Sequence, residues 1–172
     1  MTLYGLGDVV PQIDPDAFVH PDATVIGNVM LGPGVTIWPQ AVLRGDQSRI
    51  VVGARTSVQD GAVLHCTRDL ETIVGADCTI GHLAHLEGCR VEDGALVGTG
   101  SIVLHRAIVR SGALVGAGAV VPNGMEVPSG AMALGVPARL RLDAVKPDQV
   151  ARPAREYQQN WARYRAEMRR LD

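Results

Sequence analysis

The chain has 172 residues, and 16 lysine and arginine residues against 18 aspartate and glutamate residues give a formal net charge of −2. This balance gives no electrostatic reason to expect a nucleic acid or an anionic membrane as partner, and no stretch is apolar over a length that would span a bilayer. With no secretory signal pattern at the N-terminus, we expect a cytoplasmic protein. Aromatic residues make up only 3% of the chain while glycine contributes 20 residues, so the core must consist of small aliphatic side chains.

Aliphatic residues recur at every sixth position across residues 17–140, after an N-terminal segment of residues 1–16. This period matches neither an α-helix nor a simple strand, and it is typical of repeat architectures. Glycine at fixed phase marks the positions where the backbone turns. Each hexad therefore predicts one short strand and one turn, and three hexads close a triangular coil of an all-β, parallel β-helix. The clearest run is Val91, Val97, Val103, Val109, Val115, Val121 and Val127.

The hexad register breaks beside two polar residues. Extra residues separate Leu43 from Val52, directly after Arg44, and Leu64 from Val74, directly after His65. Such insertions are expected as loops that bulge from the prism, where binding and catalytic residues concentrate.

Residues 141–172 lose the hexad pattern and predict a linker followed by a C-terminal α-helix. Apolar residues recur there at steps of three and four on a segment rich in arginine and glutamate, which indicates an amphipathic helix. We expect its apolar stripe to pack against the coil or a neighbouring subunit. The stripe consists of Ala154, Tyr157, Trp161, Tyr164 and Met168.

Counting hexads places polar residues on the outside of successive coils. Arg44, His65 and Glu87 each follow an inward aliphatic residue of one face and form a vertical column, with neighbours at the spacing of paired strands. Asp60 and His82 stack at the corner that leads to this face, with Gln59 just before it. We expect all six to converge on one edge of the prism, as listed here: Arg44, Gln59, Asp60, His65, His82 and Glu87. His85 also points outward on this face, whereas His105 maps to the other corner and is expected to lie outside the cluster.

With these residues placed, the chain resembles the γ-class carbonic anhydrase family of hexapeptide-repeat proteins, whose β-helix is left-handed. The matching motifs are Arg44-Gly45-Asp46, Val58-Gln59-Asp60-Gly61, Leu64-His65, Gly81-His82 and Leu86-Glu87-Gly88-Cys89. The resemblance implies a homotrimer in which three ligands hold one catalytic metal, zinc or iron(II), between two subunits. Carried over residue by residue, the ligands are His65, His82 and Glu87, where Glu87 stands in place of the family's third histidine and His85 is the alternative ligand.

The resemblance also implies roles for four candidate catalytic residues. Arg44 and Asp46 are expected to form intersubunit contacts, Gln59 to orient substrate or metal-bound water, and Asp60 to support the metal ligands. The implied reaction is reversible hydration of CO₂ to bicarbonate by metal-bound hydroxide, which makes the chain a metal-dependent lyase. The family's proton-shuttling glutamates have no clear counterparts, because Gln47 follows Asp46 and the insert after His65 offers only Glu71.

Two other functions are compatible with the same residues. The chain could be a hexapeptide acyltransferase, or another enzyme acting on coenzyme A thioesters, with a histidine as general base. It could also be a metal-binding scaffold without hydratase activity. The sequence leaves open which metal is bound, whether Glu87 or His85 is the third ligand, which residue shuttles protons and whether CO₂ is the physiological substrate.

Overall fold

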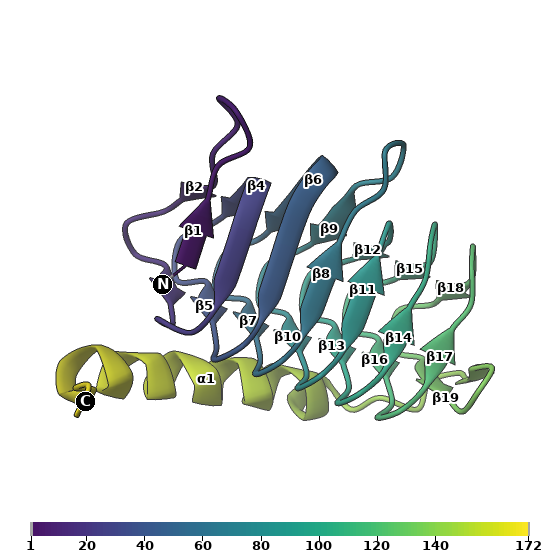
Figure 1. Ribbon diagram of the computed structural model, residues 1–172. Coiled ribbons are helices and arrows are strands. Elements are labelled where there is room, and N and C mark those ends of the chain that lie inside the picture. Colours follow the sequence, from purple (N-terminus) through teal and green to yellow (C-terminus); the bar gives the residue numbers. More distant parts are fainter. Residues whose placement is uncertain (1, 172) are drawn as a thin grey trace.

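Short parallel strands stack into a triangular prism along most of the chain (Figure 1). The computed structural model describes residues 2–171 and has the predicted fold, a left-handed parallel β-helix of hexapeptide repeats with one C-terminal helix. Three faces make up the prism. The first carries β4 (Thr24–Leu31), β6 (Val42–Val52), β8 (Val63–His65), β11 (His85–Glu87), β14 (Ile102–Val103) and β17 (Val120–Val121).

The other two faces complete each coil. On the second face, the end of β6 is followed by β9 (Thr72–Val74), β12 (Arg90–Val91), β15 (Ile108–Val109) and β18 (Glu126–Val127). The third face carries β3 (Phe18–Val19), β5 (Thr36–Ile37), β7 (Ser57–Val58), β10 (Thr79–Ile80), β13 (Leu96–Val97), β16 (Leu114–Val115) and β19 (Met132–Leu134).

Both ends of the prism carry additional strands. In the N-terminal segment, β1 (Thr2–Tyr4) and β2 (Gln12–Ile13) pair in parallel with β4 and so extend the stack. At the other end, β20 (Arg139–Arg141) pairs antiparallel with β19. The antiparallel pairing marks the point where the chain leaves the coil.

The inward side chains form one continuous aliphatic core. Leu43, Leu64 and Leu86 pair in register on the first face, and all three are fully buried. Each is preceded two positions earlier by a fully buried alanine: Ala41, Ala62 and Ala84. This alternation of a large and a small residue lets three strands meet at the narrow axis of the prism.

The two register breaks have different structures. The insert after His65 is a tight loop closed by an antiparallel bridge between Thr67 and Leu70, as predicted. The break after Arg44 is not a loop, so that prediction is wrong. The extra residues instead lengthen β6 into one strand that crosses a corner of the prism, because β4 pairs with it on both sides of the corner around a register shift between Gly27 and Val29.

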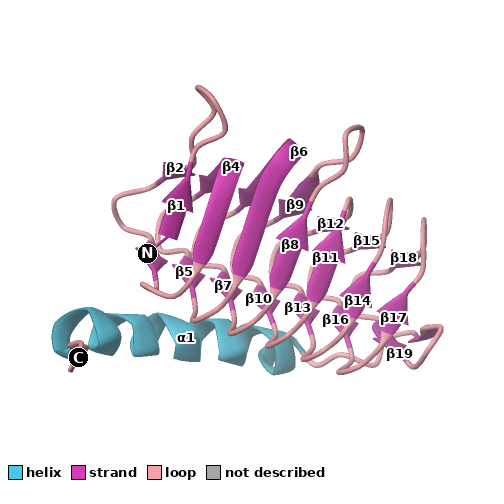
Figure 2. Cartoon of the chain, in the orientation of Figure 1, coloured by secondary structure: helices cyan, strands magenta, loops and turns pink. Residues whose placement is uncertain are grey.

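The C-terminal helix, α1 (Pro147–Glu167), lies along the third face beside β5, β7 and β10 (Figure 2). Trp161 stacks on Phe18 with ring centroids 5.9 Å apart, while Tyr157 and Tyr164 pack edge-on against Trp38. The predicted packing of the apolar stripe on the coil is thus confirmed, although Met168 lies just past the helix and is exposed. Within residues 2–171, no helix has the length and apolar character needed to cross a bilayer.

Candidate functional site

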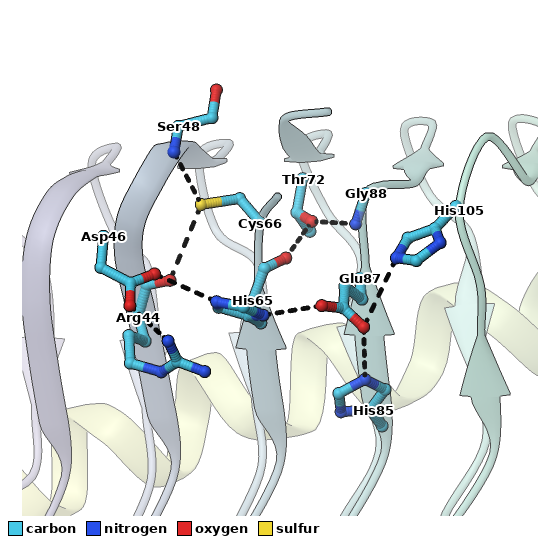
Figure 3. Close-up of polar contacts among 10 residues, drawn as sticks. All are labelled: Arg44, Asp46, Ser48, His65, Cys66, Thr72, His85, Glu87, Gly88 and His105. Carbon is cyan, nitrogen blue, oxygen red and sulfur yellow. Dashed lines mark hydrogen bonds and ion pairs between the residues drawn. The ribbon is translucent and has the colours of Figure 1, made fainter. Parts of the chain in front are cut away.

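A histidine and a glutamate from neighbouring coils form the centre of the candidate site (Figure 3). His65 ends β8 and Glu87 ends β11, and the parallel register places the two residues side by side. His65 Nδ1 lies 2.7 Å from Glu87 Oε1. Both side chains are about four-fifths buried, with 16% and 23% of their surfaces exposed. A carboxylate only accepts hydrogen bonds, so Nδ1 carries the proton and Glu87 orients the ring.

The other ring nitrogen of His65 faces a second carboxylate. Nε2 lies 3.0 Å from Asp46 Oδ1, and Arg44 donates to the other oxygen of Asp46. Burial raises the pKa of Asp46, but the hydrogen bonds from Arg44 and His65 outweigh it and hold that pKa below its ordinary value. Figure 3 shows the imidazole held between these two carboxylates. Nε2 is therefore open to another partner only when Asp46 moves away from it.

Two further imidazoles lie close to Glu87. His85 Nε2 lies 3.6 Å and His105 Nε2 lies 3.5 Å from its second oxygen. Burial raises the pKa of Glu87, but the hydrogen bond and charge of His65, with smaller contributions from His105 and His85, bring it below its ordinary value. The expectation that His105 lies outside the cluster is therefore wrong. The turn between β14 and β15 is tight, with Arg106 at a φ of 60° and its amide donating to Gly88 O, and this turn brings His105 back to Glu87.

A threonine links the two strand ends that carry the pair. Thr72 is fully buried, its hydroxyl donates to His65 O, and its oxygen accepts from the Gly88 amide at 2.8 Å. Gly88 follows Glu87 with a φ of +58°, and an added Cβ there would lie 2.9 Å from Leu70 Cβ. The sequence analysis missed Thr72, because the hexad pattern does not distinguish it from other strand residues. The available signal was its position, which lies just after the insert and two residues before the inward Val74, so that its hydroxyl also points inward.

The remaining predicted residues form a second group, at the start of the same strands. His82 Nδ1 lies 3.0 Å from Asp60 Oδ2, and Gln59 Oε1 accepts from the His82 amide at 3.2 Å. His82 Nε2 lies 3.2 Å from the hydroxyl of Tyr157 on α1. Asp60 precedes β8, whereas His65 ends it. The expectation that all six polar residues converge on one edge is therefore not met within a single chain.

The expected metal ligands are therefore divided between the two groups. His65 and Glu87 are adjacent, with His85 next to Glu87, whereas His82 contacts Asp60 and Tyr157. Among residues 2–171 of one chain, no three histidine, cysteine, aspartate or glutamate side chains are placed to hold a metal ion. Tetrahedral ligands of zinc lie about 3.3 Å apart, so the His65–Glu87 pair at 2.7 Å is a hydrogen bond that would have to open slightly to admit one.

Comparison with known proteins identifies the fold family. A family model described as bacterial transferase hexapeptide (six repeats) matches residues 11–45. A solved structure of a hexapeptide transferase family protein from Anaplasma phagocytophilum is 33% identical, with a TM-score of 0.86, over 97% of this chain and 98% of that chain. The chain belongs to the hexapeptide transferase family.

Two further similar proteins match only part of this chain. The carnitine operon protein CaiE of Escherichia coli O157:H7 is 45% identical over 104 residues, which are 60% of this chain and 53% of that protein. The chain thus spans about half the length of the curated relatives it matches. The structure of PerB from Caulobacter crescentus in complex with CoA and GDP-perosamine is 27% identical, with a TM-score of 0.56, over 77% of this chain and 57% of that chain. Hydration of CO₂, expected from the sequence, stays a prediction.

Proposed function

We propose that this protein acts on coenzyme A thioesters, with His65 as the general base for transfer of the acyl group. The observation that carries the proposal is the His65–Glu87 hydrogen bond of 2.7 Å. A carboxylate on Nδ1 fixes the tautomer whose Nε2 can take a proton, and it stabilises the cation that results. Membership of a transferase family and the similarity to a structure that contains CoA support the thioester as substrate class.

The acyl acceptor must displace Asp46 from Nε2. Arg44 already pairs with Asp46, and because the Arg44 side chain is 44% exposed, this ion pair has room to swing towards solvent as a unit. Nε2 then takes the proton of an alcohol, amine or water as its oxygen or nitrogen attacks the thioester carbonyl. The new C–O or C–N bond forms, the C–S bond breaks, and the proton passes from His65 to the departing thiolate.

The cysteines give no support to an acyl-enzyme intermediate. Cys66, Cys78 and Cys89 are all buried in the coil. Burial raises the pKa of Cys89 to about 12 and that of Cys78 to about 12, so these thiols are protonated at neutral pH. Because no accessible thiolate is present among these cysteines, the proposed route is direct attack by the acceptor with His65 as base.

The test is release of free coenzyme A from acetyl coenzyme A by the purified full chain. His65→Gln keeps the size and polarity of the side chain but removes the base, and kcat is expected to fall roughly 100-fold or more. His20→Gln is the matched control, because His20 pairs with Asp22 in the N-terminal coil and contacts no residue of the pair. Full turnover in His65→Gln would rule out the proposed role.

A second candidate is metal-dependent hydration of CO₂ in a homotrimer. It is favoured by the adjacency of two expected ligands, His65 and Glu87. The third, His82, would have to come from a neighbouring subunit, and the metal would supply the Lewis acid. Metal content, subunit mass, CO₂ hydration and thioester turnover are measured on one preparation. This candidate would be favoured if the parent protein binds stoichiometric metal and hydrates CO₂, and if His65→Ala loses the metal while the trimer persists. A metal-free chain that releases coenzyme A would eliminate it.

A further inference from the structure

Three arginines without carboxylate partners surround one cavity beside the candidate site. The cavity has a volume of about 490 Å³ and lies where the insert after His65 meets the second face of the prism. Arg68 comes from the insert, Arg90 from β12 and Arg106 from the turn before β15. Within residues 2–171, none of these three guanidinium groups forms an ion pair.

Other outward arginines of the coils are neutralised. Arg49 pairs with Glu71 at 2.7 Å, Arg55 with Asp77, and Arg110 with both Glu92 and Glu126. Ion pairs between successive coils are therefore the ordinary arrangement in this prism. The three arginines at the cavity depart from it, and their mutual repulsion is the cost of gathering them.

The acidic residues at the cavity do not cancel this charge. Asp69 and Glu71 also line it, but Glu71 is already engaged by Arg49, whose two nitrogens contact both of its oxygens. Asp69 is the one remaining carboxylate among the described residues of the lining, against three guanidinium groups. The cavity thus has a net positive charge that suits an anion.

The floor of the cavity is apolar on either side of Arg90. The register of β12 places Arg90 between Ile73 of β9 and Ile108 of β15, and Leu70 also lines the cavity. Guanidinium groups bind phosphate oxygens through paired N–H donors, whereas isoleucine side chains suit a flat ring or an alkyl chain. A group that is apolar and phosphorylated would use both features.

The cavity adjoins the catalytic pair. Gly88, which lines it, directly follows Glu87, and the cavity arginine Arg106 directly follows His105, whose ring contacts Glu87. A substrate anchored by its phosphates in the cavity would therefore extend past Gly88 towards His65.

We propose that this cavity binds a phosphate-bearing portion of the substrate, held by Arg68, Arg90 and Arg106. The ligand class rests on the proposed thioester chemistry, and the phosphates come either from the nucleotide end of coenzyme A or from a phosphorylated acyl acceptor. In both cases the cavity selects substrates by charge, because the guanidinium groups lack partners until the anion arrives.

Calorimetric titration of the full chain with adenosine 3′,5′-bisphosphate, and separately with inorganic pyrophosphate, tests the site without any turnover. Affinity is expected to fall roughly tenfold in Arg90→Gln and further in the variant with all three arginines changed to glutamine. It should also weaken as salt rises from about 0.01 M to about 0.15 M. Arg141→Gln on β20 is the control, with wild-type binding expected. No binding of either probe at low salt, or equal binding in the triple variant with its fold intact by circular dichroism, would overturn the proposal.

Kinetics distinguish the two phosphate sources. If coenzyme A supplies the phosphates, Arg90→Gln raises KM for an acyl coenzyme A and leaves KM for the matching acyl pantetheine unchanged. If probe binding is lost but both KM values are unchanged, the acceptor supplies them. Phosphate binding in a protein that turns over no thioester would refute the proposed function and leave this site standing, whereas thioester turnover with no phosphate binding would do the reverse.

Discussion

His65 and Glu87 are 22 positions apart in the chain, yet their Nδ1 and Oε1 atoms lie 2.7 Å apart on adjacent coils. The pairing follows from the repeat, because one coil with its insert brings each residue back to the same phase of the same face. Asp46 Oδ1, from the preceding coil, lies 3.0 Å from His65 Nε2. His105 Nε2, from the following coil, lies 3.5 Å from Glu87 Oε2. The prism thus assembles a line of alternating acidic and imidazole groups from four successive coils.

Glu87→Gln should abolish most of the thioester turnover while leaving substrate binding in place. Glutamine keeps the shape of the side chain but has an N–H₂ that no longer selects the Nδ1–H tautomer, so Nε2 is not presented as the base. We expect kcat to fall roughly 100-fold, with KM within about twofold of wild type.

Glu126→Gln is the matched control for that variant. Glu126 is exposed on β18 and pairs with Arg110, so the same chemical change there should leave kcat at its wild-type value. A full-speed Glu87→Gln enzyme would mean that His65 needs no carboxylate to act.

The lowered pKa of Glu87 predicts how stability depends on pH. Its ordinary value is near 4.5, and the folded state holds it lower because contacts with His65, His105 and His85 outweigh burial. A depressed carboxyl pKa stabilises the folded state fully above the ordinary value and loses that contribution as pH falls through the folded value. The stability advantage of wild type over Glu87→Gln should therefore be constant from about pH 6 to about pH 5 and shrink below about pH 4.5.

Thermal unfolding of both proteins at a series of pH values measures this difference. Melting temperatures that stay equally far apart down to about pH 3 would contradict the assigned pKa direction. Asp46, whose pKa is also lowered, is present in both proteins, so only its coupling to Glu87 through His65 enters the comparison.

Much of the fold could be predicted because the sequence of each hexad by itself indicates one strand and one turn. An inward aliphatic residue and a turn residue recur at fixed phase, so counting alone places Leu43, Leu64 and Leu86 in one column and the residues after them beside one another. The adjacency of His65 and Glu87, and of Asp60 and His82, followed from the same count.

The contacts that counting missed depend on more than the phase of a residue in its hexad. Arg106 has a φ of 60° at the same phase as Gly100 and Gly112, so the turn after His105 is an ordinary one. Counting places His105 at this turn but does not give the direction of its side chain, whose Nε2 lies 3.5 Å from Glu87 Oε2. β6 continues through the register break because β4 pairs with it on both sides of the break, which is a tertiary property. His82 contacts Tyr157 because α1 docks on the third face, and helix periodicity gives the apolar stripe but not its position along the prism.

Gly88→Ala should destabilise the protein more than an alanine at another left-handed glycine. Gly88 has a φ of +58°, and an added Cβ would lie 2.9 Å from Leu70 Cβ and 3.0 Å from His105 Cδ2. Strain and overlap together should cost about 2–4 kcal/mol. For a chain of this size that lowers the melting temperature by roughly 4–16 °C.

Gly118→Ala separates the two contributions. Gly118 has a φ of +66° with no atom within 4 Å of the added Cβ, so only the backbone strain of about 1–2 kcal/mol applies. Equal destabilisation by the two alanines would show that the insert and the His105 turn do not crowd Gly88.

Thr72 should act as a positioning residue for the catalytic pair. Its hydroxyl joins His65 O to the Gly88 amide, and so it fixes the end of β8 against the residue that follows Glu87. Thr72→Val keeps the volume but leaves a buried amide and carbonyl without that partner, which should cost about 1–3 kcal/mol of stability. Because the His65 and Glu87 side chains would then lose their fixed separation, kcat should fall roughly tenfold with KM unchanged.

Thr72→Ser restores the hydroxyl and removes only a methyl group. Its kcat should return to within about twofold of wild type, although stability stays lower by about 1 kcal/mol because of the small void. A role in packing alone predicts the opposite order, since valine fills the core better than serine. The comparison of kcat in the two variants, each measured at a temperature where it is fully folded, therefore decides whether this hydroxyl positions the pair or merely fills the coil.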